Sequence, residues 1–113
     1  MLPAAARLTS SESFRRCVRA GRRAGSRTVV VHLDASADAS GEPPCKVGFV
    51  VGRDVGGAVT RNRVRRRLRH LVRAHLDELP AGVLVVRALP AAADADAHEL
   101  RSDLGRCLGR VLP

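Results

Sequence analysis

The order of hydrophobic patterns predicts an α+β fold in which helices pack on a small sheet. Three segments show apolar residues at helical spacing, and three short runs are rich in β-branched residues. The two kinds of segment are interspersed along the chain, which is typical of helices layered against one sheet. The length of 113 residues suits one domain, which we place at residues 1–113.

The first half of the chain predicts one helix and two strands. Thr9 followed by Glu12 forms a capping-box pattern, and the helical spacing after it predicts a helix over about Ser10 to Ala20. Two β-branched runs follow, and the loop between them contains Gly and Pro, which favours a hairpin-like return. The first strand, the loop and the second strand are predicted at Thr28 to Leu33, Ala35 to Pro44 and Cys45 to Gly52.

The segment Gly57 to Leu79 predicts the longest helix. Its apolar residues fall on one stripe that would pack on a core, while its other faces are rich in arginine, and no acidic residue lies between Val55 and Leu76. Because like charges three and four residues apart repel each other, such a helix is typical of a surface that binds a polyanion. A merely solvated basic helix is the alternative. The stripe is Val64, Leu68, Leu71, Val72, Leu76 and Leu79, and the basic faces hold Asn62, Arg63, Arg65, Arg66, Arg67, Arg69, His70 and Arg73.

The last third of the chain predicts a strand and a final helix. The apolar run Val83 to Leu89 predicts a strand, and Pro90 ends it. A linker of small residues, Ala91 to Ala97, leads to the helix. Asp94 and Asp96 favour the positive N-terminal end of that helix rather than a metal site. The apolar stripe of the helix is Leu100, Leu104, Cys107, Leu108 and Val111.

Composition limits the partner and the compartment. The formal net charge is +9, and every basic residue except Lys46 is arginine, which favours a nucleic acid as partner. No apolar run is long enough to cross a bilayer and the N-terminal residues lack a signal-peptide pattern, so we expect a cytoplasmic protein. The three widely spaced cysteines predict neither a disulfide framework nor a zinc site.

No catalytic constellation can be argued from the sequence. A protein nuclease needs carboxylates that hold Mg²⁺, or a histidine acid and base placed across a phosphate. The acidic residues fall mostly in presumed loops and helix ends, and His70 and His75 have no clear partner. His32 interrupts a strand with no second ligand at metal spacing. We therefore predict no catalytic residue and no metal site in the protein, and binding of RNA or DNA as its task.

One run of residues resembles the signature of a known family. The residues Gly57 to Arg66 read Gly-Ala-Val-Thr-Arg-Asn-Arg-Val-Arg-Arg, and the strand Lys46 to Val51 precedes them. This run resembles the Arg-Asn-Arg region of the protein subunit of bacterial ribonuclease P. Arg7-Leu8 followed by Phe14 is similar to the family's opening, and the order of elements and the basic character agree over essentially the whole chain.

The resemblance implies a fold and a task. The fold would be like that of the second domain of ribosomal protein S5, with an unusual left-handed β-α-β crossover through the arginine-rich helix. The chain would be the protein subunit of a ribonucleoprotein endonuclease, in which the RNA subunit uses Mg²⁺ to cleave the 5′ leader from precursor tRNA. The protein would bind the catalytic RNA and precursor tRNA without cutting, and we expect neither membrane nor DNA as partner.

The resemblance also implies two surfaces that contact RNA. The arginine-rich helix would meet the catalytic RNA and help to organise metal ions nearby, and a cleft along the sheet would take the single-stranded leader. Val18 and His32 stand where the family often has aromatic residues, so leader contacts would depend on shape and charge. The RNA-binding residues would be Arg53, Arg61, Asn62, Arg63, Arg65, Arg66, Arg69 and Arg73, and the cleft residues Phe14, Val18, Val30 and His32.

Two other classes of function remain open at this point. An RNA-binding module without enzymatic role, such as a ribosomal protein, would bind structured RNA but would not stimulate cleavage of precursor tRNA. A helix-turn-helix protein would prefer duplex DNA, but the predicted strands flank the basic helix on both sides and no short helix directly precedes it.

Overall fold

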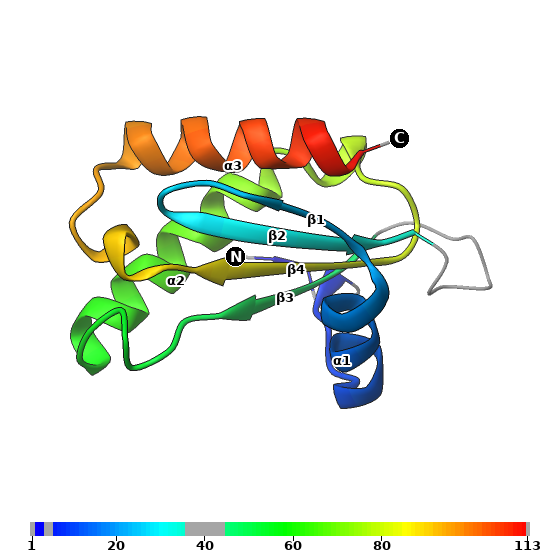
Figure 1. Ribbon diagram of the computed structural model, residues 1–113, viewed down its shortest axis with the longest axis horizontal. Helices are drawn as coiled ribbons and strands as arrows, with labels where there is room; N and C mark the ends of the chain where they lie inside the picture. The colour runs from blue at the N-terminus through cyan, green and yellow to red at the C-terminus, as the bar shows by residue number, and fades with distance from the viewer. Residues whose placement is uncertain (1, 4–5, 36–44, 113) are drawn as a thin grey trace.

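The structure is a computed structural model that describes residues 2–3, 6–35 and 45–112. A four-stranded sheet in the order β1-β2-β4-β3 is packed with helices (Figure 1), which confirms the predicted α+β fold. The strands are β1 (Arg22–Gly25), β2 (Val29–Asp34), β3 (Lys46–Val50) and β4 (Val83–Ala88), the helices are α1 (Ser11–Ala20), α2 (Ala58–Arg73) and α3 (Ala97–Val111), and 3-10 turns lie at Leu76–Glu78 and Pro90–Ala93.

The helix α2 connects the two parallel strands of the sheet. β1 with β2 and β2 with β4 are antiparallel pairs, whereas β3 runs parallel to β4. Parallel neighbours need a crossover connection, and α2 provides it. The left-handed course that the resemblance implies for this crossover stays a prediction.

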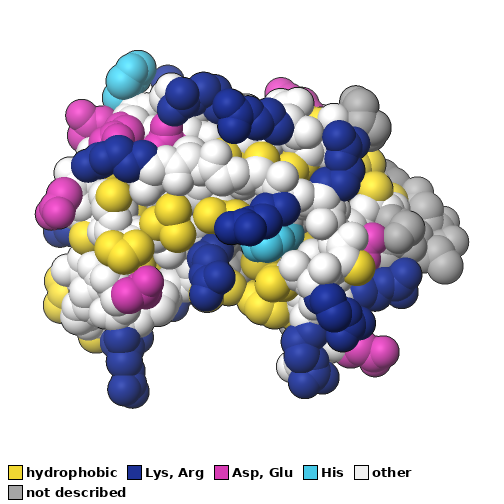
Figure 2. All heavy atoms as spheres, in the orientation of Figure 1, with side chains coloured by type: hydrophobic (Ala, Val, Ile, Leu, Met, Phe, Trp, Pro, Cys, Tyr) yellow, Lys and Arg dark blue, Asp and Glu magenta, His cyan; other side chains and the backbone are white. Residues whose placement is uncertain are grey.

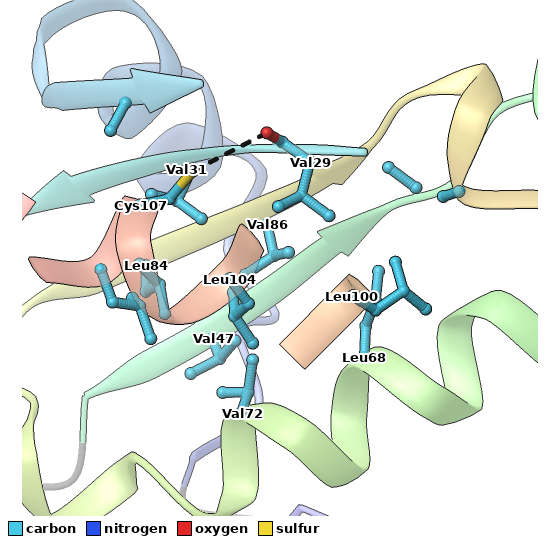
Figure 3. Packing of buried hydrophobic residues seen from close by; sticks show 14 of the residues in the cluster. Val29, Val31, Val47, Leu68, Val72, Leu84, Val86, Leu100, Leu104 and Cys107 are labelled. Carbon is cyan, nitrogen blue, oxygen red and sulfur yellow. Dashed lines mark hydrogen bonds between the residues drawn. The ribbon is translucent and has the colours of Figure 1, made fainter. Parts of the chain in front are cut away.

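The main core lies between the sheet, α2 and α3. Alternate residues of the strands point to this side, and Leu68 and Val72 of α2 meet Leu100 and Leu104 of α3 there (Figure 3). Both predicted apolar stripes are confirmed. Of the predicted stripe, Val64, Leu68 and Val72 of α2 are fully buried and Leu71 is partly buried. Leu76 and Leu79 lie beyond the end of α2 but also pack on the core. The packing holds one side of α2 against the core and leaves the rest of its surface free to contact a partner.

The opposite face of the sheet is covered only in part, by α1. Cys17 of α1 packs there with Val83 and Val85 of β4, and Leu8 and Phe14 lie against this smaller cluster. The Cys17 thiol donates a hydrogen bond to the His32 carbonyl oxygen at 3.2 Å. The Cys17, Cys45 and Cys107 thiols are all free and buried. The uncovered part of this face is therefore the second surface that a partner can reach.

The pairing of the strands differs from the sequence prediction. β2 and β3 do not form a hairpin, because β4 lies between them. The hairpin partner of β2 is β1, a strand that was not predicted since its sequence, Arg-Arg-Ala-Gly, has no β-branched residue. Most of the loop predicted at Ala35 to Pro44 lies outside the described residues.

Two helix boundaries also differ from the prediction. α2 ends at Arg73 rather than Leu79, and a 3-10 turn follows it. Pro80 disfavours the helical conformation at Leu79, which is extended with ψ of 137°. The cap of α1 is Ser10 rather than Thr9, since the Ser10 hydroxyl accepts the hydrogen bond from the Ser13 N–H. Asp96 caps α3 by accepting from the Glu99 N–H at 2.8 Å, in agreement with the predicted role.

Candidate nucleic-acid interface

The surface of α2 that faces away from the core is basic. Asn62, Arg63, Arg66, Arg69 and Arg73 are exposed, as is Arg53 before the helix, while Arg61 and Arg65 are partly buried. The ion pairs found among the described residues all lie elsewhere, on α1, α3 and the turn at Leu76–Glu78. The arginines of this surface therefore have no carboxylate to neutralise them within that part of the chain.

Hydrogen bonds orient several guanidinium groups of α2. Arg63 donates to the Ala93 carbonyl at 3.1 Å, and Arg67 donates to the Ala95 carbonyl at 3.2 Å, so both side chains connect α2 to the segment before α3. Arg65 donates to the side-chain oxygen of Asn62 at 3.1 Å. Each guanidinium has five N–H donors, so all three side chains keep donors for a further acceptor.

The N-terminal end of α2 adds positive charge to the same region. Gly57 is the N-cap and provides no side-chain hydrogen bond, and the first turn has no acidic residue. Backbone N–H groups at a helix start are unpaired within the helix and attract anions. Arg61 lies in the next turn. The backbone of the helix start and the arginine side chains thus favour the same kind of partner, one with many negative charges.

The residues of the predicted leader cleft share the open side of the sheet but differ in exposure. Val30 and His32 of β2 are only 6% and 5% exposed, and Phe14 of α1 is partly buried against Cys17 and β4. Val18 of α1 is 38% exposed. The structure thus brings the four residues to one side of the sheet, but the two from β2 offer little surface for contact with a ligand.

Two arginines that were not predicted as site residues lie beside these β2 residues. Arg23 of β1 is the cross-strand partner of His32, and Arg87 of β4 is the partner of Val30. Both are exposed, and Figure 2 shows several basic side chains on this face of the molecule. Arg87 is the only charged residue in the apolar run of its strand. This pattern could have identified it as a candidate site residue from the sequence. The accessible part of the cleft is therefore more basic than predicted.

The imidazole of His32 is held in its neutral form. Burial lowers its pKa from the ordinary value of 6.5, and the charges of Arg23 and Arg87 lower it further. Its Nδ1 atom is buried and has no hydrogen-bond partner within the described part of the chain. Protonation would place a third positive charge next to the two guanidinium groups, which explains the direction of the shift.

We expect the free energy of unfolding to decrease as the pH falls below about 6.5. In that range the unfolded chain takes up a proton on His32 more readily than the folded protein does. Above about pH 7 His32 is neutral in both states, so it no longer makes the free energy of unfolding depend on pH. Urea titrations between pH 5 and pH 7.5 should show a smaller pH dependence for His32→Gln than for the unchanged protein. His98→Gln, at an exposed position of α3, is the control. Equal pH dependence of His32→Gln and the unchanged protein would contradict the prediction.

Neither a metal cluster nor a membrane span is found in the part of the chain that the structure describes. No three His, Cys, Asp or Glu side chains gather there as a metal site. None of the helices is long and apolar enough to cross a bilayer.

The sequence matches one family over nearly its whole length. The family model described as Ribonuclease P matches residues 2–112. A ribonuclease P protein component from a Nocardioides species is 57% identical over 112 residues, which cover 98% of this chain and 95% of the relative. The protein of the same name from Corynebacterium diphtheriae is 48% identical over 117 residues, covering 98% of this chain and 97% of that one.

Solved structures show the same fold. An RNase P protein mutant from Staphylococcus aureus superposes with a TM-score of 0.83 at 24% identity, covering 94% of this chain and 87% of the other. The RNase P protein from Thermotoga maritima gives a TM-score of 0.77 at 24% identity, covering 93% and 96%. The resemblance drawn from the Arg-Asn-Arg run is thus confirmed, and the chain belongs to the family of bacterial ribonuclease P protein components.

Proposed function

We propose that this protein binds the catalytic RNA of ribonuclease P through the basic surface of α2 and so promotes removal of the 5′ leader from precursor tRNA in the cytoplasm. The observation that supports this most is the set of α2 arginines, for which the described residues provide no carboxylate partner, on a helix whose other side is fixed in the core. Guanidinium groups match phosphate oxygens in pairs, and neutralising phosphates releases counterions. RNA is therefore the partner that this surface fits best.

The chemistry of cleavage is assigned to the RNA subunit and its Mg²⁺. The protein's contribution would be to reduce the repulsion between the phosphates of the catalytic RNA and those of the substrate, so that the two associate at a lower Mg²⁺ concentration. The predicted RNA-binding residues, from Arg53 to Arg73, would act in this way. No residue of the protein is given a catalytic role.

The open face of the sheet is proposed to bind the single-stranded leader. Arg23 and Arg87 would contact leader phosphates, and the exposed Val18 would pack against sugars and bases. Proteins that bind single strands combine a basic groove with stacking side chains. Because Val30 and His32 are buried and Phe14 is partly covered, charge would contribute more than stacking here, and we expect little base preference.

A test of the proposal is cleavage of precursor tRNA by a bacterial RNase P RNA at low Mg²⁺, with and without the protein. Substrates with long and very short 5′ leaders should both be cleaved faster with the protein, and the gain should be larger for the long leader. The double variant Arg23→Ala, Arg87→Ala should lose only the additional stimulation of cleavage that the long leader provides. If the protein stimulates cleavage equally for long and short leaders, the open face of the sheet does not bind the leader. If the protein binds RNA tightly but does not stimulate cleavage, it is an RNA-binding module of another kind.

The structure disfavours the DNA-binding alternative. In a helix-turn-helix protein the recognition helix follows another helix after a short turn. Here α2 follows β3 and is followed by the 3-10 turn Leu76–Glu78 and then β4. The arrangement that places a helix in the major groove of DNA is therefore missing from α2 and its neighbours.

A further inference from the structure

A pocket of about 450 Å³ lies at the outer edge of the sheet, between the N-terminal segment and α2. β3 is the edge strand there, and the N-terminal segment runs along it. Arg7 forms a parallel bridge with Val47, and the Leu8 N–H donates to the Val47 carbonyl at 2.9 Å. Pockets for small ligands are typically about 300–1,000 Å³ in volume, so this one can hold a single small molecule or one residue of a polymer.

Three arginines line the pocket, and none of the described residues that line it is acidic. The Nε atom of Arg7 donates to the Leu2 carbonyl at 3.2 Å, which orients the guanidinium and leaves its terminal N–H groups available. Arg65 is held by Asn62, and Arg69 is exposed. Three positive charges around one cavity repel each other, and an anion with several oxygens would relieve that repulsion through charge-assisted hydrogen bonds.

Apart from Thr9, the rest of the wall has no polar side chain among the described residues. Phe49 is partly buried against the main core and also lines the pocket, and Leu2 and Leu8 add aliphatic surface. An inorganic anion would use the arginines and leave this apolar part in contact with water. A ligand that covers both parts needs a negatively charged group joined to a flat, largely apolar ring system, which can stack on an aromatic side chain. A nucleotide has this composition.

We propose that the pocket binds a single nucleotide, with its phosphate against Arg7, Arg65 and Arg69 and its base against Phe49 and Leu8. The nucleotide has two possible sources, an unstacked residue of an RNA strand or a free nucleoside phosphate. The first source rests on the proposed function, because Arg65 and Arg69 belong to the RNA-facing surface of α2. The pocket lies at the edge strand β3, whereas Val30 and His32 lie on β2, and Leu8 is the pocket residue that also packs near Phe14 of the leader face.

Equilibrium dialysis of the free protein with each of the four nucleoside 5′-monophosphates tests the pocket directly. At least one of them should bind about tenfold more tightly than both inorganic phosphate and its own nucleoside. Phe49→Leu keeps an apolar side chain but removes the ring, and Arg69→Gln removes one charge at an exposed position. Each should weaken nucleotide binding about tenfold. Arg101→Gln, on the exposed side of α3, should have no effect.

Thermal unfolding would show that each variant is folded, and Arg69→Gln provides the test if Phe49→Leu is not, because the Arg69 side chain is exposed. The proposal is overturned if no nucleoside monophosphate binds more tightly than inorganic phosphate. It is also overturned if the folded pocket variants and the Arg101→Gln control have the same affinity for nucleotide.

Binding of the catalytic RNA distinguishes the two sources. If the occupant is an RNA residue, Phe49→Leu should weaken RNA binding about tenfold without changing its salt dependence, because no phosphate contact is lost. If the occupant is a free nucleotide, Phe49→Leu should weaken nucleotide binding about tenfold and leave the affinity for RNA unchanged. The salt dependence of RNA binding by the α2 arginines tests the proposed function separately, so the two proposals can fail independently.

Discussion

Replacing Arg66 and Arg73 together by alanine is expected to weaken binding of the catalytic RNA by roughly 10- to 100-fold at about 0.1 M salt. Both side chains are exposed on α2 and lie outside the nucleotide pocket. Each phosphate contact that is lost also lowers the slope of log affinity against log salt by about one, so the pair should lower it by about two. The protein's own stability should change little, because neither side chain is buried.

Filter binding or fluorescence anisotropy with a labelled catalytic RNA, at several salt concentrations, measures both quantities. Arg101→Ala with Arg110→Ala is the matched control, since these arginines are exposed on α3 and their loss changes the net charge equally. The control should show a small loss of affinity and nearly the original slope. If plots of log affinity against log salt concentration have the same slope for the α2 variant and the unchanged protein, Arg66 and Arg73 do not contact phosphates.

Leu68→Ala is expected to reduce the free energy of unfolding by about 2–5 kcal/mol. Leu68 is fully buried where α2 meets α3 and the sheet (Figure 3), so its truncation leaves a cavity that the surrounding residues cannot readily fill. Because the total stability of a domain is only about 5–15 kcal/mol, a large share would be lost. Urea unfolding of the free protein at constant pH measures this difference.

Val59→Ala is the matched control for Leu68→Ala. Val59 lies on the same helix but is 82% exposed, and its truncation should change the free energy of unfolding by less than about 0.5 kcal/mol. Similar losses for the two variants would show that α2 is not packed as described. A Leu68→Ala protein that remains folded should still bind RNA with the original salt dependence, since all arginines of the surface are kept.

The elements predicted correctly are those whose own residues determine them. The apolar stripe of α2, with Val64, Leu68 and Val72, shows a helical period that does not depend on any distant partner. β1 could not be predicted in this way, because Arg-Arg-Ala-Gly has little strand propensity and is extended through its pairing with β2. The position of β4 between β2 and β3 was missed for a related reason, since Gly and Pro in a loop indicate a turn but not which strand will be the neighbour.

The candidate sites also divide into those that local sequence determines and those that depend on contacts between distant segments. The α2 arginines could be placed on one surface from the sequence, because helix geometry alone orders them. Arg23 and Arg87 could not, since they come from strands far apart in the chain and meet only across β2. The pocket at β3 was equally hidden, because it forms only when the segment around Arg7 pairs with Val47.

The position of β4 in the sheet also determines the order of events during protein synthesis. β4 is the last strand in the chain, yet it pairs with both β2 and β3. A nascent chain that has released α2 from the ribosome still lacks the strand that completes the sheet and the α3 residues that cover Leu68. The most basic segment is therefore exposed before its tertiary packing exists, next to ribosomal RNA, and folding through such non-local contacts must wait until translation is nearly finished.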